Sequence, residues 1–206
     1  MKFILGLKQN MAQYLDKNGK AHPATLLSAG PIVVTQIKTK EKDKYNSIQF
    51  GYGKKKKTKK PQAKLAELSP DKIGFRYLKE FRLVDNKSEL KKGDIVDASS
   101  FAEGDKVEVS GISKGKGFQG VVKRHGFHGG PRTHGQKHSE REPGSIGAGG
   151  VQRVFKGKRM AGRMGGDRIT VKNLKILKID KDNNEMLVSG AIPGRRGTLL
   201  EIKSVK

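Results

Sequence analysis

Short runs of alternating apolar and polar residues recur along the chain, separated by turn residues. The run at residues 33–39, V-V-T-Q-I-K-T, is typical of a half-buried β-strand. The same pattern predicts strands at residues 3–7, 24–27, 32–37, 47–52, 75–83, 95–101, 105–111, 168–171, 174–179, 186–188 and 199–202. Turn signals lie at residues 17–20, 29–31 and 182–184. The pattern therefore predicts a mainly β fold built from a curled sheet.

Because strands precede and follow one long irregular segment, we expect a closed antiparallel β-barrel interrupted by insertions, in an α+β class chain. A short helix is expected at residues 62–68, and Ser69-Pro70-Asp71 resembles the start of a second one. The expected parts follow in chain order. They are 1–53, first part of the barrel; 54–96, a lysine-rich arm and a small α+β insertion; 97–112, barrel strands; 113–167, an extended loop; and 168–206, completion of the barrel.

The segment at residues 111–168 has an unusual composition. It holds 16 of the 27 glycines, four of the five histidines, 13 Lys or Arg and three acidic residues. Its large apolar residues follow neither a helical nor a strand period. Such a segment buries too little apolar surface to offset an ordering cost of about 1–2 kcal/mol per residue. We expect it to be largely disordered beyond its base until a partner orders it.

Charge indicates what that partner is. The 44 Lys and Arg exceed the 20 Asp and Glu by a net +24, which favours a nucleic acid over an acidic membrane surface. The lysine run at residues 54–60 is either a solvated linker or a phosphate-binding arm, and the overall charge favours the arm. The absence of Cys excludes disulfides and thiolate metal sites. Without a long apolar run, we expect a soluble, intracellular protein.

One stretch, Gly115 to Gly120, matches the G-x-G-x-x-G template of dinucleotide-binding loops. That template requires a helix directly afterwards, but Val121, Val122, the following glycines and Pro131 disfavour one. A Walker loop is excluded as well, because Gly117 rather than Ser or Thr follows the lysine. No nucleotide cofactor is expected.

The histidines His125, His128, His134 and His138 could ligate zinc by their spacing. The glycines remove the helix that would bring the rings together, and the neighbouring cations repel a metal ion. We therefore expect no metal, and instead expect the rings to stack on bases or donate to phosphate and 2′-hydroxyl groups. Nor do the adjacent residues His138, Ser139 and Glu140 aim at one another as a catalytic triad would, so no enzyme is expected.

Three stretches carry a resemblance to a known family: SGISKGKGFQGVVKRHGFHGGPRTHGQKHSEREPGSIG, RVFKGKRMAGRMGGDRITVKNLKI and LVSGAIPGRRG. With VVTQIKT and LKEFR earlier in the chain, they resemble the universal large-subunit ribosomal protein three family in its bacterial form. The resemblance implies a barrel of the translation-protein type and a cytoplasmic place in the large ribosomal subunit. It also implies direct binding of 23S rRNA, a part in nucleating subunit assembly, and an extension that reaches toward the peptidyl transferase centre. The neighbours it implies are ribosomal proteins fourteen and nineteen, with no cofactor, metal, membrane or small-molecule substrate.

The residues expected to bind rRNA are the cations and rings of the lysine arm and the extension. They are Lys54, Lys55, Lys56, Lys57, Lys59, Lys60, Lys114, Lys116, Phe118, Lys123, Arg124, His125, His128, Arg132, His134, Lys137, His138, Arg141, Arg153, Lys156, Lys158, Arg159, Arg163 and Arg168. Some relatives carry a methylated glutamine where this chain has Arg163, so that modification is not expected. Residues 148–152 also lack a proline that the resemblance implies there.

Overall fold

The computed structural model describes residues 2–83 and 90–205 of the chain. The chain divides into two compact units. One comprises Met1–Ile112 and Ile169–Lys206, and we call it the barrel unit. The other is Ser113–Arg168, which we call the glycine-rich unit. The ends of the glycine-rich unit lie within one residue of the extended loop expected at residues 113–167.

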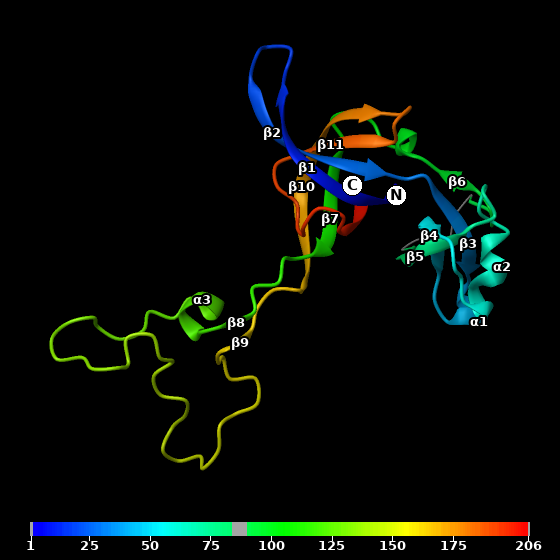
Figure 1. The fold of residues 1–206 in the computed structure, drawn as a ribbon. Helices are drawn as coiled ribbons and strands as arrows, with labels where there is room; N and C mark the ends of the chain where they lie inside the picture. The colour runs from blue at the N-terminus through cyan, green and yellow to red at the C-terminus, as the bar shows by residue number, and fades with distance from the viewer. Residues whose placement is uncertain (1, 84–89, 206) are drawn as a thin grey trace. The chain divides into compact units, whose positions relative to one another are not determined.

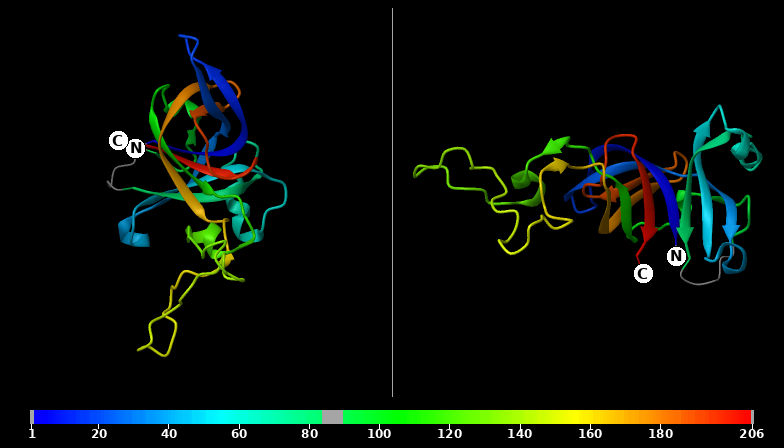
Figure 2. Two further views of the ribbon diagram at one scale, coloured as in Figure 1. Left: turned by 90° about the vertical axis from the view of Figure 1, so that its left-hand side faces the viewer. Right: turned by 90° about the horizontal axis from the view of Figure 1, so that it is seen from below.

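Six strands of the barrel unit close into a barrel (Figures 1 and 2). In spatial order they are β1 (Phe3–Leu15), β12 (Leu199–Ser204), β7 (Lys106–Ile112), β10 (Arg168–Asp180), β11 (Glu185–Ser189) and β2 (Ala21–Ala29). The first and last strands pair antiparallel, with Ile4 opposite Ile202. Closure of the barrel therefore needs both ends of the sequence. The prediction of a mainly β fold is confirmed.

A second sheet of four strands holds part of the sequence that was expected in the barrel. Its order is β5 (Gly74–Arg82), β4 (Ser47–Lys55), β3 (Ile32–Lys38) and β6 (Ile95–Val96). The assignment of residues 32–53 to the barrel is wrong, since β3 pairs with β4 and β6. The expectation that residues 54–96 form a separate small α+β insertion is wrong as well, because β5 and β6 belong to the same sheet as β3 and β4. Residues 84–89, inside that expected insertion, lie outside the described residues.

Only short helical segments accompany these sheets. They are α1 (Lys40–Asp43), the 3₁₀ turn Lys60–Gln62, α2 (Ala63–Ala66) and the 3₁₀ turn Ala98–Ser100. The helix expected at residues 62–68 is present in shorter form. The helix start expected at Ser69 is wrong: the Lys72 amide donates to the Ser69 carbonyl over 2.9 Å and closes a turn. The strand expected at residues 95–101 ends at Val96, where the chain turns into the second 3₁₀ segment.

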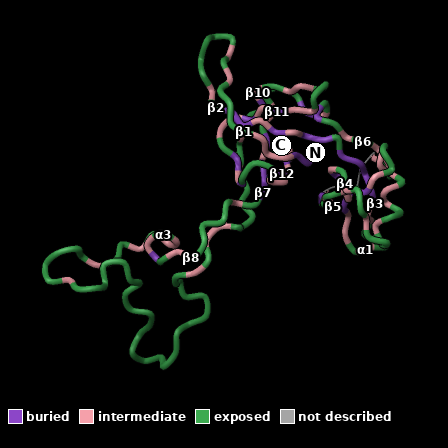
Figure 3. Tube along the Cα trace, in the orientation of Figure 1, coloured by how far each residue is buried: buried purple, intermediate pink, exposed green. Residues whose placement is uncertain are grey.

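One hydrophobic core joins the barrel to the four-stranded sheet. The ring of Phe3 in β1 lies 4.7 Å from that of Phe81 in β5 and 5.4 Å from that of Phe50 in β4, measured between centroids. The Tyr52 hydroxyl donates to the Ser28 carbonyl over 3.1 Å. Figure 3 shows buried residues along both sets of strands. The two sheets therefore stabilise each other through shared apolar contacts.

The glycine-rich unit contains little regular structure. Its elements are β8 (Phe118–Gln119), α3 (Val121–His125) and β9 (Gly162–Arg163). The expectation that no helix follows Gly120 is wrong. The helix forms because it needs only one turn: Val121 is buried at its start, and Gly126 ends it in the left-handed conformation at φ 72°. The dinucleotide template still fails, because β8, the strand directly before α3, pairs antiparallel with β9 rather than in a parallel crossover.

Candidate nucleic-acid interface

The two arms of the glycine-rich unit pair where the unit begins and ends. The Ser113 amide donates to the Asp167 carbonyl over 2.9 Å. The Lys116 amide donates to the Met164 carbonyl, and the Met164 amide returns a bond to Gly117, each over 2.9 Å. Gly165 makes this close approach possible, since a Cβ there would lie 2.2 Å from the Lys114 carbonyl oxygen. We call this paired segment the base of the unit.

Farther along the unit than the base, Arg124 and His125 of α3, both predicted to bind rRNA, make contacts within the unit itself. The Arg124 guanidinium donates to the Met160 carbonyl over 2.7 Å, and a ring nitrogen of His125 lies 3.1 Å from the same oxygen. Gly162 leaves room for the guanidinium, because a Cβ there would lie 2.7 Å from Arg124 Nη1. Arg124 and His125 therefore connect α3 to the returning arm, and both are half-buried.

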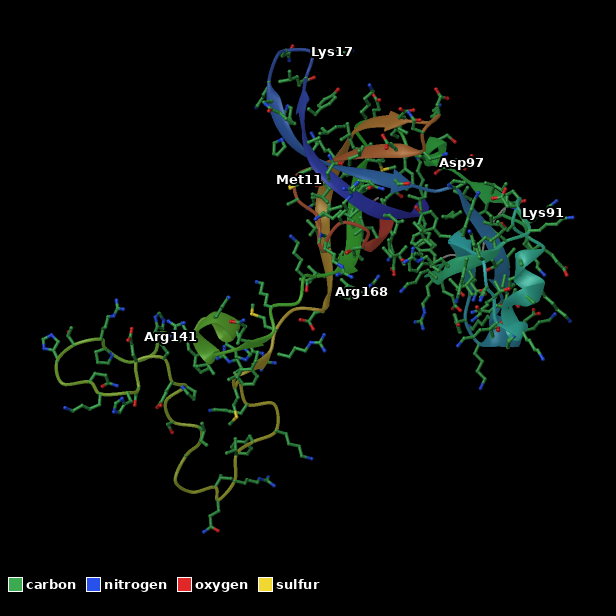
Figure 4. The ribbon with its side chains drawn as sticks, viewed as in Figure 1. Met11, Lys17, Lys91, Asp97, Arg141 and Arg168 are labelled. Atoms are coloured by element: carbon green, nitrogen blue, oxygen red, sulfur yellow. The ribbon has the colours of Figure 1, made fainter. Side chains whose placement is uncertain are left out.

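Beyond α3 the chain forms a loop that carries several predicted ligands. The Gly130 amide donates to the Glu140 carbonyl over 2.9 Å and closes the loop, and the Arg132 guanidinium lies 3.5 Å from the Glu140 carboxylate. Between these closing residues the loop presents Arg132, His134, Lys137 and His138, all exposed. Arg141 follows it and is exposed as well (Figure 4).

An open cleft of about 740 Å³ lies beside this loop. His125, Phe127, His128 and Arg159 are among the residues that line it, and the Arg159 guanidinium lies 5.2 Å from the centre of the Phe127 ring. Of the four histidines, the structure brings His125 and His128 to this cleft. Within residues 2–83 and 90–205 no cluster of three or more His, Cys, Asp or Glu side chains could hold a metal ion.

Exposure is the dominant property of the glycine-rich unit. All of its residues are described, and Val121 is the one buried among them (Figure 3). Phe118 is 76% exposed and Phe155 54% exposed, although each is a large apolar side chain. The remaining predicted ligands of the unit are exposed: Lys114, Lys116, Lys123, Arg153, Lys156, Lys158, Arg159, Arg163 and Arg168. A surface with this many exposed cations and exposed aromatic rings is suited to phosphates and bases.

The lysine arm belongs to the barrel unit. Lys54 and Lys55 end strand β4, and Lys60 begins a 3₁₀ turn. Lys54 forms an ion pair with Asp71. Lys56, Lys57 and Lys59 lie between these elements and are exposed, whereas Lys55 is half-buried. The arm thus consists of short ordered pieces rather than one free linker.

Among the exposed cations that the sequence prediction omitted are two adjacent arginines, Arg195 and Arg196, in the connection between β11 and β12. The arginine doublet inside the stretch P-G-R-R-G was the available signal. It was missed because the doublet lies outside both the lysine run and the glycine-rich segment. No helix in the described part of the chain is long and apolar enough to cross a membrane.

A closed β-barrel, a net charge of +24 and an exposed unit rich in Lys and Arg define the chain as a strongly basic β-barrel protein. The model of the family Ribosomal protein L3 matches residues 6–192, and the chain belongs to that family. The resemblance noted in the sequence is therefore confirmed. As a member of this family, the chain is a ribosomal protein and not an enzyme.

Curated relatives match along nearly the whole chain. The large ribosomal subunit protein uL3 of Desulfitobacterium hafniense (strain Y51) is 48% identical over 211 residues, covering 100% of this chain and 97% of the relative. The large ribosomal subunit protein uL3c of Guillardia theta is 48% identical, with 97% and 98% covered. The large ribosomal subunit protein uL3 of Chloroherpeton thalassium (strain ATCC 35110 / GB-78) is 44% identical, with 100% of each chain covered.

Proposed function

We propose that this chain is a structural constituent of the large ribosomal subunit in the cytoplasm and that it binds 23S rRNA directly. The glycine-rich unit is the main binding element, and the lysine arm is a second one. The binding residues are those predicted from the sequence, with Arg124 and His125 acting chiefly to hold the unit's own arms together. Names of the relatives, as proteins of the large ribosomal subunit, support this assignment.

One observation carries the proposal. The glycine-rich unit has 13 Lys and Arg, three acidic residues and a single buried side chain. A segment with one buried residue gains too little from apolar burial to offset its ordering cost, so its ordered state needs a partner. Its charge makes that partner a polyanion, and glycine lets the backbone approach a phosphate chain closely.

The finer parts of the proposal come from the family resemblance and from this exposure. The glycine-rich unit penetrates folded rRNA and extends toward the peptidyl transferase centre, and Phe118, Phe127 and Phe155 insert into cavities between nucleotides. The six-stranded barrel, of the translation-protein type, fixes the register of the chain on the rRNA. Early binding of this kind helps to nucleate subunit assembly beside ribosomal proteins fourteen and nineteen. Any effect on peptide transfer is indirect, through the position of the rRNA.

Salt dependence of binding tests the proposal. Affinity of the chain for a 23S rRNA fragment should fall by ~10³ or more between 50 and 200 mM salt if six or more phosphates are engaged. A variant with glutamine at Lys114, Lys116, Lys123, Lys156 and Lys158 should bind more weakly and with a shallower salt slope. A control variant loses the same charge at exposed lysines outside the predicted set, Lys17, Lys20, Lys40, Lys42 and Lys44. A flat salt response of the unaltered chain, or equal slopes for the two variants, would contradict the proposal.

A further inference from the structure

The connection between β11 and β12 is held in place at many points although it lacks regular structure. At its start, the Gly190 amide donates to the Pro23 carbonyl and the Thr25 hydroxyl donates to the Gly190 carbonyl, each over 2.7 Å. Ile192 is 5% exposed and packs in the core of the barrel unit. A chain segment anchored in this way loses little conformational freedom when it binds a ligand.

Lys8 of strand β1 holds the middle and the end of the connection. Its ammonium donates to the Ile192 carbonyl over 2.7 Å and to the Gly194 carbonyl over 3.0 Å. Its backbone amide donates to the Thr198 carbonyl over 3.0 Å, and its carbonyl accepts from the Gly197 amide over 2.8 Å. The backbone on both sides of residues 195 and 196 is therefore tied to one barrel strand.

A tight turn presents the two side chains between these ties. The Thr198 amide donates to the Arg195 carbonyl over 3.1 Å, and Gly197 has φ 80° in the third position, as in a type II turn. Gly194, before the turn, is buried at φ 93°, and a Cβ there would lie 2.6 Å from the Thr198 side chain. Arg195 and Arg196 are both exposed, and neither pairs with an acidic residue within residues 2–83 and 90–205.

We propose that Arg195 and Arg196 form a preorganised phosphate-binding turn on the barrel unit that receives the backbone of the 23S rRNA. The planar guanidinium matches phosphate oxygens with two parallel hydrogen bonds, and a charged acceptor makes those bonds strong. Two adjacent cations repel each other in the free chain, and a phosphate relieves that repulsion. This inference rests on the proposed function, but it assigns a ligand to residues outside the predicted set and outside the 6–192 family match.

The mode of binding differs between the two sites. The turn is rigid before RNA arrives, whereas the glycine-rich unit orders on binding. The turn therefore contributes to the first encounter with rRNA at a lower ordering cost, and its effect depends on the backbone geometry as well as on its charge.

Three variants of the full chain test this inference with the same 23S rRNA fragment. Arg195→Gln/Arg196→Gln removes both charges, Gly194→Ala displaces the turn without changing charge, and Lys17→Gln/Lys20→Gln removes two charges from the exposed β1–β2 turn. Circular dichroism and thermal unfolding check that each variant folds. If Gly194→Ala does not fold, the arginine variant alone decides, because both side chains are exposed.

We expect the arginine variant to lower affinity by ~10-fold or more and to reduce the salt slope by about 2, which is roughly 0.9 per lost phosphate contact. Folded Gly194→Ala should approach this result, and the Lys17/Lys20 variant should match the unaltered chain. Unchanged affinity in the arginine variant, with a steep salt slope in the unaltered chain, overturns the inference and leaves the proposed function standing. Weaker binding at an unchanged slope overturns the phosphate assignment and indicates another contact. A flat slope in the unaltered chain contradicts the proposed function itself.

Discussion

Gly165 offers a direct test of the base of the glycine-rich unit. Replacing it with alanine puts a Cβ 2.2 Å from the Lys114 carbonyl oxygen, in a residue whose φ is 77°. The clashing atom belongs to the backbone and cannot rotate away. The left-handed conformation costs alanine about 1–2 kcal/mol, and loss of the two bonds between Met164 and the opposite arm adds about 1 kcal/mol each. We expect the base to be destabilised by about 3 kcal/mol, or roughly 100-fold in its opening equilibrium.

Amide hydrogen exchange of the free chain measures this opening, because exchange of a paired amide reports its local stability. The Lys116 and Met164 amides should exchange roughly 100-fold faster in Gly165→Ala, unless full opening limits the change. Gly149→Ala is the matched control, because a Cβ at Gly149 meets nothing within 4 Å and its φ is not in the left-handed region. If the Lys116 and Met164 amides exchange at the same rates in Gly165→Ala as in the unaltered chain, the pairing of the base and the need for glycine beside the Lys114 carbonyl would be refuted.

The barrel unit and the glycine-rich unit give three further predictions. Ile202→Ala should lower the free energy of unfolding by about 2–5 kcal/mol in urea titration, because Ile202 is 0% exposed, whereas Ile169→Ala, at 45% exposed, should cost less than about 1 kcal/mol. The Lys38 ammonium, which donates to Glu80 over 2.6 Å, lowers the pKa of that carboxyl and has its own pKa raised. The stability that this ion pair gives the folded chain is therefore complete above an ordinary glutamate pKa of about 4.3 and is lost as pH falls through the lowered pKa. Glu80→Gln should therefore weaken the fall of the unfolding free energy with decreasing pH in that range, and an unchanged pH dependence would argue against the ion pair. Limited proteolysis of the free chain should cut first between Gly115 and Gly166 and spare that region in the ribosome, and equal protection in both states would exclude ordering on binding.

Local patterns were enough to find most strands, because alternation depends only on which side chains face the core. They could not say which strands pair. The sequence of residues 33–39 fits a strand in either sheet equally well, and it is the pairing of β3 with β4 and β6 that takes this strand out of the barrel. Likewise, Ile4 opposite Ile202 closes the barrel across almost the whole sequence, which no window of residues reveals.

In the candidate interface, too, the sequence predicted local properties but not the contacts between distant segments. Composition alone marked the exposed cations, since 13 Lys and Arg without a core pattern must face solvent or a partner. Composition did not show that Arg124 and His125 bond to the Met160 carbonyl, because that contact joins segments 35 or more residues apart. The one-turn helix before Gly126 was missed because propensity disfavours its valines, while burial of Val121 and the glycine C-cap stabilise it.

Cross-linking in purified ribosomes tests the role of the glycine-rich unit most directly. Large subunits separated on a gradient are irradiated, and the peptides joined to 23S rRNA are identified by mass spectrometry. Nearly all of the chain should sediment with the large subunit, and peptides of Ser113–Arg168 should dominate the cross-links. A chain found mainly away from the large subunit, or cross-links confined to the barrel unit, would contradict it.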